Sequence, residues 1–124
     1  MHKVSVIVST YNWPEALEMV LQSLIDQKDR NFEVIVADDG SGPETANTII
    51  RMQKKSPVPI KHFWQEDMGY RLSRVRNGAI KIAEGDIVVF TDGDCCLLPD
   101  FVSNHRKVAE PGCFVTGKRV FLKR

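Results

Sequence analysis

Short runs of β-branched and other apolar residues recur along the chain, with stretches of helical periodicity between them. Three of these runs contain few polar residues and are found at Val4–Ser9, Phe32–Ala37 and Asp86–Thr91. Nearly continuous apolar runs of this length are typical of strands buried on both faces, as in a parallel sheet that helices cover. Two weaker runs, Ile60–Trp64 and Cys113–Leu122, predict further strands.

Between the predicted strands, apolar residues spaced three and four positions apart predict four helices. The helices are expected at Pro14–Gln27, Pro43–Lys55, Leu72–Glu84 and Pro99–Ala109. Asn12 is the expected N-cap of the first helix, because its side chain can accept a hydrogen bond from a free backbone N–H. Trp13 is expected to pack under the adjoining loop, with a place at the rim of a ligand pocket as the alternative.

The alternating order of strands and helices predicts the fold class. Alternation at this spacing favours a three-layer, Rossmann-like α/β domain with a mostly parallel sheet and right-handed crossovers. A length of 124 residues suits one core, so residues 1–124 are assigned to a single domain. The last predicted strand ends the chain with an open edge, as expected of a truncated piece of something longer.

Composition and charge exclude several other classes of protein. Apolar residues make up 43% and charged residues 27%, and a net charge of +1 gives no field that favours nucleic acid or a membrane surface. No apolar run approaches the roughly 20 residues of a membrane span, and no signal segment precedes the first strand. The sequence therefore predicts the cytoplasm, with the inner face of the membrane as an alternative. A metal site at Cys95 and Cys96 is less favoured than ordinary packing, because no second Cys or His pair stands at ligand spacing.

Polar side chains follow three of the predicted strands at the point where each strand ends. They are Thr10, Tyr11 and Asn12 after the first strand, Asp38 and Asp39 after the second, and Asp92 and Asp94 after the strand at Asp86–Thr91. Open α/β sheets bind ligands outside the carboxyl ends of their strands, where the strand order reverses. Groups from three separate strand ends therefore predict a ligand site on one rim of the sheet.

The segment Asp92-Gly93-Asp94 is the candidate metal site. Alternate residues of an extended segment point the same way, so both carboxylates can face one ion, and Gly93 lets the backbone bend. Hard oxygen ligands suit Mg²⁺ or Mn²⁺, which also bind phosphate oxygens and neutralise a departing diphosphate. The alternative is a polar turn, since Asp-Gly is common in turns.

Two further groups are candidates for nucleotide binding. One of the adjacent carboxylates Asp38 and Asp39 is expected to cap the helix that begins near Pro43, which leaves the other free to bind a base or ribose. Arg76 is expected at the pocket, where a guanidinium can grip phosphate or hold the acidic residues in place. Isolated histidines, including His62, are read as surface or edge residues rather than ligands.

With these residues in hand, the sequence resembles glycosyltransferase family 2, whose members have the GT-A fold and use nucleotide sugars. The stretches that match the family in order and spacing are VSVIVSTYN (Val4–Asn12), SLIDQ (Ser23–Gln27), FEVIVADDGS (Phe32–Ser41), RNGAIKIAEGDIVVFTDGD (Arg76–Asp94) and a helix start at Pro99-Asp100. Each is weak alone, and together they are specific over nearly the whole chain.

The resemblance implies a role for each candidate residue. Residues matching Thr10, Tyr11 and Asn12 line the nucleotide pocket, those matching Asp38 and Asp39 contact uracil or ribose, and Arg76 matches a residue near the base and diphosphate. Asp92 matches a residue near ribose and metal-bound water, and Asp94 matches a direct ligand of Mn²⁺ or Mg²⁺. The family implies a UDP-sugar donor, inverting transfer to a glycan or lipid-linked acceptor, and an acidic general base in the second half. That base is expected beyond Arg124, so we expect the 124-residue chain to bind donor and metal but to transfer sugar poorly.

Two alternatives use the same acidic rim. One is a receiver-like, Mg²⁺-binding signalling domain, which needs an acidic pair after the first strand, where this chain has Thr10, Tyr11 and Asn12. The other is a non-catalytic nucleotide-binding domain, which these residues fit equally well. The type of sugar and the acceptor are not specified by any of these motifs.

Overall fold

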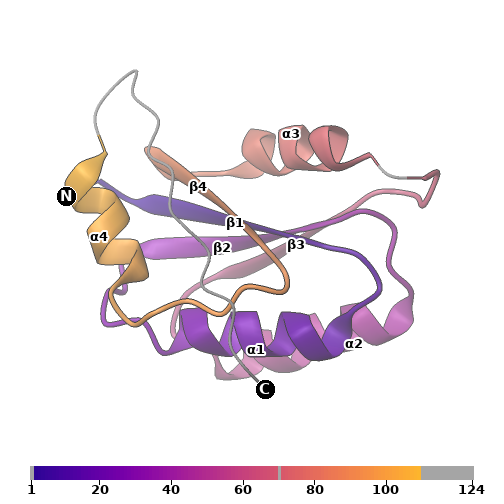
Figure 1. Ribbon diagram of the computed structural model, residues 1–124, viewed down its shortest axis with the longest axis horizontal. Helices are drawn as coiled ribbons and strands as arrows, with labels where there is room; N and C mark the ends of the chain where they lie inside the picture. The colour runs from indigo at the N-terminus through magenta and orange to yellow at the C-terminus, as the bar shows by residue number, and fades with distance from the viewer. Residues whose placement is uncertain (1, 70, 110–124) are drawn as a thin grey trace.

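A four-stranded, fully parallel sheet forms the centre of the domain, and helices cover both of its faces (Figure 1). The computed structural model describes residues 2–69 and 71–109. The elements in chain order are β1 (Val4–Thr10), α1 (Pro14–Ile25), β2 (Phe32–Asp38), α2 (Pro43–Lys55), β3 (Ile60–Trp64), α3 (Leu72–Ile82), β4 (Ile87–Asp92) and α4 (Phe101–Val108). The predicted α/β class, the alternating order and the parallel sheet are confirmed.

The strands are ordered β3-β2-β1-β4, so the order reverses between β1 and β4. The register places Thr10 beside Asp38 on one side of β1 and Ser9 beside Asp92 on the other. This order begins the 3-2-1-4-5-6 arrangement of dinucleotide-binding sheets, whereas receiver-like sheets have the order 2-1-3-4-5. The predicted strand at Cys113–Leu122 lies outside the described residues.

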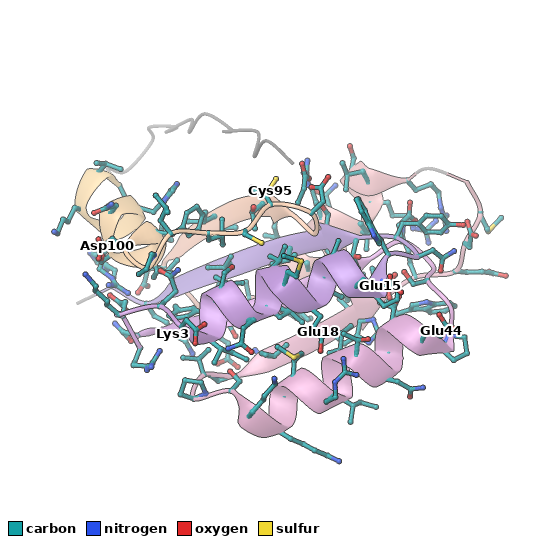
Figure 2. All side chains as sticks on the ribbon, turned by 60° about the horizontal axis from the view of Figure 1, so that its bottom comes forward. Lys3, Glu15, Glu18, Glu44, Cys95 and Asp100 are labelled. Carbon is teal, nitrogen blue, oxygen red and sulfur yellow. The ribbon has the colours of Figure 1, made fainter. Side chains whose placement is uncertain are left out.

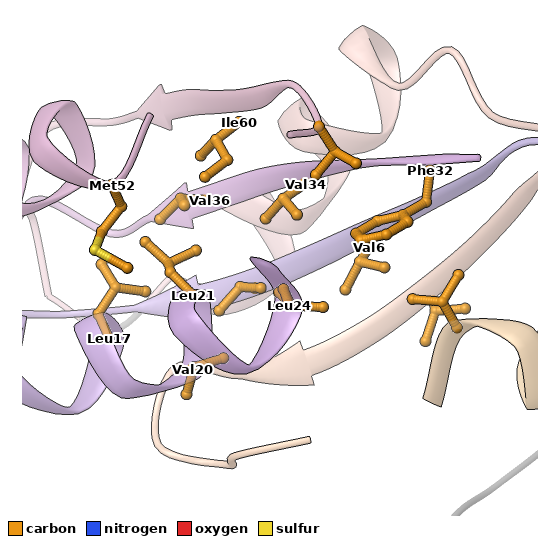
Figure 3. Close-up of a cluster of buried hydrophobic side chains, with 14 of the residues drawn as sticks. Val6, Leu17, Val20, Leu21, Leu24, Phe32, Val34, Val36, Met52 and Ile60 are labelled. Atoms are coloured by element: carbon orange, nitrogen blue, oxygen red, sulfur yellow. The ribbon is translucent and has the colours of Figure 1, made fainter. Parts of the chain in front are cut away.

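The larger core cluster lies between the sheet and the layer formed by α1 and α2 (Figure 3). In α1, Leu17, Val20, Leu21 and Leu24 are buried because they lie on one stripe of the helix. They pack against the β1 and β2 side chains that point to this face, such as Val6 and Val34. Burying each such side chain contributes about 1.5–3 kcal/mol, which makes this side of the domain the rigid support of the strand ends.

Among the described helices, α3 is the one that covers the second face of the sheet, over a smaller cluster that includes Ile7, Ile35, Val75 and Ala79. Because α3 packs over β1, β2 and β3, it leaves part of β4 open. Val88 and Phe90 of β4 are accordingly 36% and 45% exposed. The expectation that this strand is buried on both faces is therefore wrong for the described part of the chain.

The connection from β4 to α4 returns across the sheet and is held by the buried side chain of Gln27. The Gln27 amide donates to the carbonyl of Leu98 at 2.6 Å and accepts from the backbone N–H of Val102 at 3.0 Å. Figure 2 shows Cys95 on this connection. The α4 helix then lies at the end of the sheet where the strands begin (Figure 1).

The first helix begins differently from the prediction. Trp13, not Asn12, stands at the N-cap of α1, and no side chain caps that helix. The Asn12 backbone has a φ of 44°, in the left-handed region that asparagine tolerates better than most residues. Its side-chain oxygen instead accepts from the backbone N–H of Gly42, the residue that precedes α2, at 2.9 Å.

Candidate functional site

A pocket of about 550 Å³ lies at the carboxyl ends of the strands, where the strand order reverses between β1 and β4. Of the residues singled out in the sequence, the pocket is lined by Thr10, Tyr11, Asp39, Asp92 and Asp94. Three separate strand ends thus deliver polar groups to one cavity. This is the place at which open α/β sheets bind their ligands.

The Asp92-Gly93-Asp94 segment is fixed to the end of β1 by a close backbone contact. The Gly93 N–H donates to the Ser9 carbonyl at 2.6 Å, and a Cβ added at Gly93 would lie 2.7 Å from that same oxygen. The Ser9 hydroxyl also donates to Asp92 Oδ1 at 3.1 Å. Glycine is therefore required for the close approach that aims the two aspartates into the pocket.

Potential metal ligands gather at this segment. One atom each from Asp92, Asp94 and Cys95 lies within 4.8 Å of the others. Asp94 is exposed, and the Cys95 thiol lies 3.4 Å from its Oδ1. Burial, followed by the Asp94 carboxylate, raises the pKa of Cys95, and its sulfur is a soft ligand. The hard carboxylate oxygens are the better ligands here.

Asp39 reaches the pocket from the end of β2 and is held by the segment that follows β3. Its Oδ1 accepts from the Gln65 amide at 2.6 Å, and its Oδ2 accepts from the Arg71 backbone N–H at 2.9 Å. Only 6% of Asp39 is exposed. These donors fix the orientation of the Asp39 carboxylate. The other lone pair on each of its oxygens remains available to a ligand.

Asp38 has a different setting from its neighbour. It is buried, does not line the pocket, and accepts from the Ser41 N–H at 2.9 Å and contacts His62 Nε2 at 2.8 Å. No side chain caps α2, so the expected helix cap at Asp38 or Asp39 is wrong. Asp38 instead braces the loop that carries Asp39, and its contact with a nucleotide stays a prediction. The expectation that His62 is a surface or edge residue did not include this contact with Asp38.

Arg76 lies beside the pocket rather than in its lining. Its Nη2 is 3.4 Å from Asp92 Oδ1, and its guanidinium carbon lies 5.5 Å from the centre of the Phe90 ring. These contacts place the Arg76 cation against Asp92. Of the two roles expected for Arg76, they fit that of holding the acidic residues in place. Its contact with a diphosphate stays a prediction, as does that of Asn12 with a nucleotide.

Asp67 was not predicted from the sequence as a pocket residue, and Trp13 was expected elsewhere. Asp67 lines the pocket and accepts from the Tyr11 hydroxyl at 2.7 Å, which raises the pKa of Tyr11 through this hydrogen bond and the carboxylate charge. Trp13 also lines it and is 54% exposed, so the expectation that it packs under the loop is wrong. Asp67 follows β3 by three residues, so the strand-end rule used for the other strands would have found it.

Close packing brings Asp67 to the pocket. Gly40 has a φ of 94°, and a Cβ added there would lie 2.5 Å from the Asp67 Cα. Glycine in this turn thus lets the segment after β3 approach the end of β2. Four carboxylates line the pocket as a result, and in residues 2–69 and 71–109 the one cation within ion-pair distance of them is Arg76.

Comparison with known proteins agrees with this geometry. The family described as Glycosyl transferase family 2 matches residues 5–121 of the chain. The validoxylamine A glucosyltransferase of Streptomyces hygroscopicus subsp. jinggangensis is 34% identical over 82% of the chain, and the hyaluronan synthase of Pasteurella multocida is 38% identical over 86%. The chain spans 24% and 11% of the lengths of these two relatives.

Solved structures of glycosyltransferases share the fold. The mannosyltransferase PcManGT from Pyrobaculum calidifontis, in complex with GDP-Man and Mn²⁺, matches 89% of the chain with a TM-score of 0.79 and 30% identity. TarS 1–349 from S. aureus, in complex with UDP-GlcNAc, matches 85% with a TM-score of 0.71 and 31% identity. The chain covers 33% and 30% of these two structures. The sheet with its acidic rim is therefore a GT-A arrangement, and the chain belongs to glycosyl transferase family 2.

Proposed function

We propose that this chain binds a nucleoside-diphospho-sugar together with Mn²⁺ or Mg²⁺, as the donor domain of an inverting, metal-dependent glycosyltransferase. The observation that carries the proposal is the convergence of Asp39, Asp92 and Asp94, from two different strand ends, on one pocket. Carboxylates gathered in one pocket repel one another, and a cation that binds between them relieves this repulsion. A diphosphate with its divalent ion supplies that cation.

The residues present fit such an ion. Asp92 and Asp94 offer exposed or half-exposed carboxylate oxygens, the ligands that Mg²⁺ and Mn²⁺ prefer, while the soft sulfur of Cys95 suits such hard cations less well. When bound, the ion acts as a Lewis acid that stabilises charge on the departing diphosphate. Among the structural relatives, PcManGT is in complex with Mn²⁺, which supports this assignment by analogy.

The nucleotide is proposed to lie against the ends of β1 and β2. Asp39 is pre-oriented by Gln65 and Arg71 to accept hydrogen bonds from a base or ribose, and Thr10 brings a hydroxyl to the same wall. Tyr11 and Trp13, both about half exposed, provide apolar surface beside it. UDP follows the usual nucleotide of the family, and the structural relatives are in complex with UDP-GlcNAc in one case and GDP-Man in the other.

The receiver-like alternative is disfavoured by topology as well as by residue type. The sheet order is β3-β2-β1-β4, and β1 ends at Thr10 without a carboxylate. A non-catalytic nucleotide-binding domain would have the same pocket and is separated from our proposal by sugar transfer in the protein that contains this chain. The general base, the glycan or lipid-linked acceptor and a cytoplasmic location stay predictions. No helix in residues 2–69 and 71–109 is long and apolar enough to cross a membrane.

The proposal is tested by calorimetric titration of the full chain with UDP and GDP, with and without Mn²⁺. We expect Mn²⁺ to strengthen binding of the preferred nucleotide by about 100-fold, as loss of a direct metal ligand commonly costs 10–100-fold or more. Asp94→Asn should remove that gain. Because Asp94 is exposed and faces other carboxylates, the variant should unfold at the same or a slightly higher temperature than the parent protein.

The matched control is Asp100→Asn, which removes an exposed carboxylate that pairs with Lys28 at 3.4 Å, outside the pocket. This variant should keep the full effect of Mn²⁺. If Asp94→Asn binds nucleotide with unchanged metal dependence, the metal assignment is wrong. If neither nucleotide binds under any condition, the donor-domain proposal itself fails.

A further inference from the structure

A second groove lies on the other side of the segment between β3 and α3. Its volume is about 910 Å³, and it shares no lining residue with the acidic pocket. Gln65 and Arg71 line the groove, while Asp67 and Leu72 of the same segment line the pocket. The groove is lined by Arg71, Arg74 and Lys81 and by one carboxylate, that of the exposed Glu66, so one stretch of chain is the wall that separates a groove with more cations than anions from an acidic pocket.

Apolar side chains form part of the groove surface. A Cβ added at Gly78 would collide with the ring of Phe63, so the absence of a side chain at Gly78 lets that ring lie against α3. Met68 and Trp64 also line the groove and are 66% and 51% exposed. The Trp64 indole is anchored by a hydrogen bond to the Ser41 carbonyl at 3.1 Å, so this surface is largely pre-formed.

Positive side chains line the same groove along α3. Arg74 and Lys81 are seven residues apart, which places them on one face of the helix about 10 Å apart, with the Asn77 amide between them. Within the described part of the chain, neither Arg74 nor Lys81 has an ion-pair partner. The Arg71 guanidinium donates to the Glu66 carbonyl at 2.8 Å, and its buried Nε has no partner among the described residues.

We propose that this groove binds a segment of an anionic polysaccharide, such as one built with uronic acid. Its carboxylates would meet Arg74 and Lys81, its hydroxyls the Asn77 amide, and its apolar sugar faces Phe63 and Met68. Arg74 and Lys81, about 10 Å apart on one face of α3, match a chain whose charges are separated by neutral sugars. They do not match the closely spaced phosphates of a nucleic acid, which carry one charge per strand every 3.4 Å or so.

Binding of the polysaccharide is independent of the function proposed for the acidic pocket. Its use as the growing or acceptor chain rests on that proposed function. The shared wall supports such a use, because Gln65 lines the groove and donates to Asp39 of the pocket at 2.6 Å. A glycan in the groove would then lie beside the donor site without occupying it.

The test is titration of the full chain with a hyaluronan octasaccharide, which carries a carboxylate on every second sugar. The same octasaccharide with its carboxylates reduced to alcohols serves as the uncharged probe. We expect saturable binding of the charged form and at least tenfold weaker binding of the reduced form. Arg74→Ala with Lys81→Ala should weaken binding of the charged form by about tenfold, because two cation–carboxylate contacts are lost.

The matched control is Lys54→Ala with Lys55→Ala, which removes two exposed cations from the end of α2 and should leave oligosaccharide binding unchanged. Equal losses in the two double variants, or equal binding of the charged and reduced probes, would overturn the proposal. So would binding to vesicles of anionic phospholipid through Arg74 and Lys81 without any oligosaccharide binding.

A parallel titration with UDP and Mn²⁺ separates this inference from the proposed function. Oligosaccharide binding without nucleotide binding would support the groove and remove the donor domain. Nucleotide binding without oligosaccharide binding would support the donor domain and overturn the proposal for the groove. If the Arg74 and Lys81 variant weakens both ligands equally, the groove is not a separate site and the inference fails.

Discussion

The two ends of the parallel sheet carry carboxylates in opposite electrostatic settings. At the amino end, Glu33 is fully buried and pairs with Lys61 at 2.8 Å, and Asp29 pairs with Arg106. At the carboxyl end, Asp39 and Asp94 have no ion pair among the described residues. Within the described part of the chain, Glu33 and Asp29 are thus paired with cations, whereas Asp39 and Asp94 are not.

Burial alone does not separate these carboxylates. Glu33 and Asp39 lie near opposite ends of β2, both are buried, and both accept two hydrogen bonds from uncharged donors. The difference is that Lys61 completes the set around Glu33, whereas nothing cationic in the described chain completes the set around Asp39. A buried carboxylate that pairs with a cation of the chain is neutralised within the fold, whereas one without a cation among the described residues is suited to binding.

The largest expected effect comes from breaking the amino-end network with Glu33→Gln. This change removes the charge that holds Lys61 and weakens the bonds from the Ser5 hydroxyl and the Glu84 N–H, both 2.6 Å long. The free energy of unfolding should fall by about 2–3 kcal/mol, below the full cost of breaking a buried pair because Lys61 can turn to solvent. Denaturant unfolding measures the loss, while the affinity of the folded protein for nucleotide should not change. A loss of affinity at unchanged stability would reverse the roles assigned to the two ends.

A somewhat smaller effect is expected from Gly93→Ala at the carboxyl end. The new Cβ would lie 2.7 Å from the Ser9 carbonyl oxygen. Because that oxygen belongs to the backbone and not to a flexible side chain, the backbone would have to move. We expect a stability loss of about 1–2 kcal/mol, and a weakening of Mn²⁺-dependent binding because Asp92 and Asp94 are displaced. Gly42→Ala is the control, since its nearest neighbour would be Asn12 Oδ1 at 4.0 Å. Equal tolerance of both changes would show that the close contact at Gly93 does not position the aspartates.

The sequence predicts the sheet and the rim well because both depend on short-range patterns. Nearly continuous apolar runs such as those of β1 and β2 favour interior strands, and in a parallel sheet their carboxyl ends must share one edge. The pattern therefore predicts that Asp39 and Asp94 lie on the same side of the molecule. The resemblance to a family supplied their roles, which the pattern alone could not.

Long-range contacts between loops account for what the sequence does not predict. The Asn12 side chain could accept a hydrogen bond from the helix that follows it or from a distant loop. It accepts from the loop because the Gly42 N–H lies close to it. His62 looks like a break in a strand until the register places it near Asp38. Each of these depends on how close two remote segments come, which composition and periodicity do not encode.

The pH dependence of stability offers a smaller test of the amino-end network. Burial, the largest single influence, raises the pKa of Glu33, but the hydrogen bonds from Lys61, Ser5 and the Glu84 N–H outweigh it, and the pKa lies below its usual 4.5. The stability that Glu33 contributes is therefore fully present above about pH 4.5–5 and is lost as the pH falls through the lower folded-state pKa. Unfolding measured from pH 6 down to 3 should show a shallower decline in Glu33→Gln than in the parent protein. Identical slopes would mean that Glu33 is not ionised in the folded chain.

The smallest expected effect concerns the pocket end, where a phenol and a carboxylate share a hydrogen bond in place of an ion pair. The bond to Asp67 and its charge raise the pKa of Tyr11, because ionising the phenol would break the bond and place two anions side by side. Asp67→Asn should lower the pKa of Tyr11 towards its ordinary value of 10.0, as measured by the absorbance of tyrosinate in a Tyr70→Phe background. Glu66→Gln is the control, since Glu66 is an exposed neighbour that does not line the pocket.

Added Mn²⁺ should lower the pKa of Tyr11 in the parent protein, because a cation in the acidic pocket favours the phenolate. If Mn²⁺ leaves it unchanged while nucleotide still binds, the charge at this end of the sheet is balanced by something other than a metal ion.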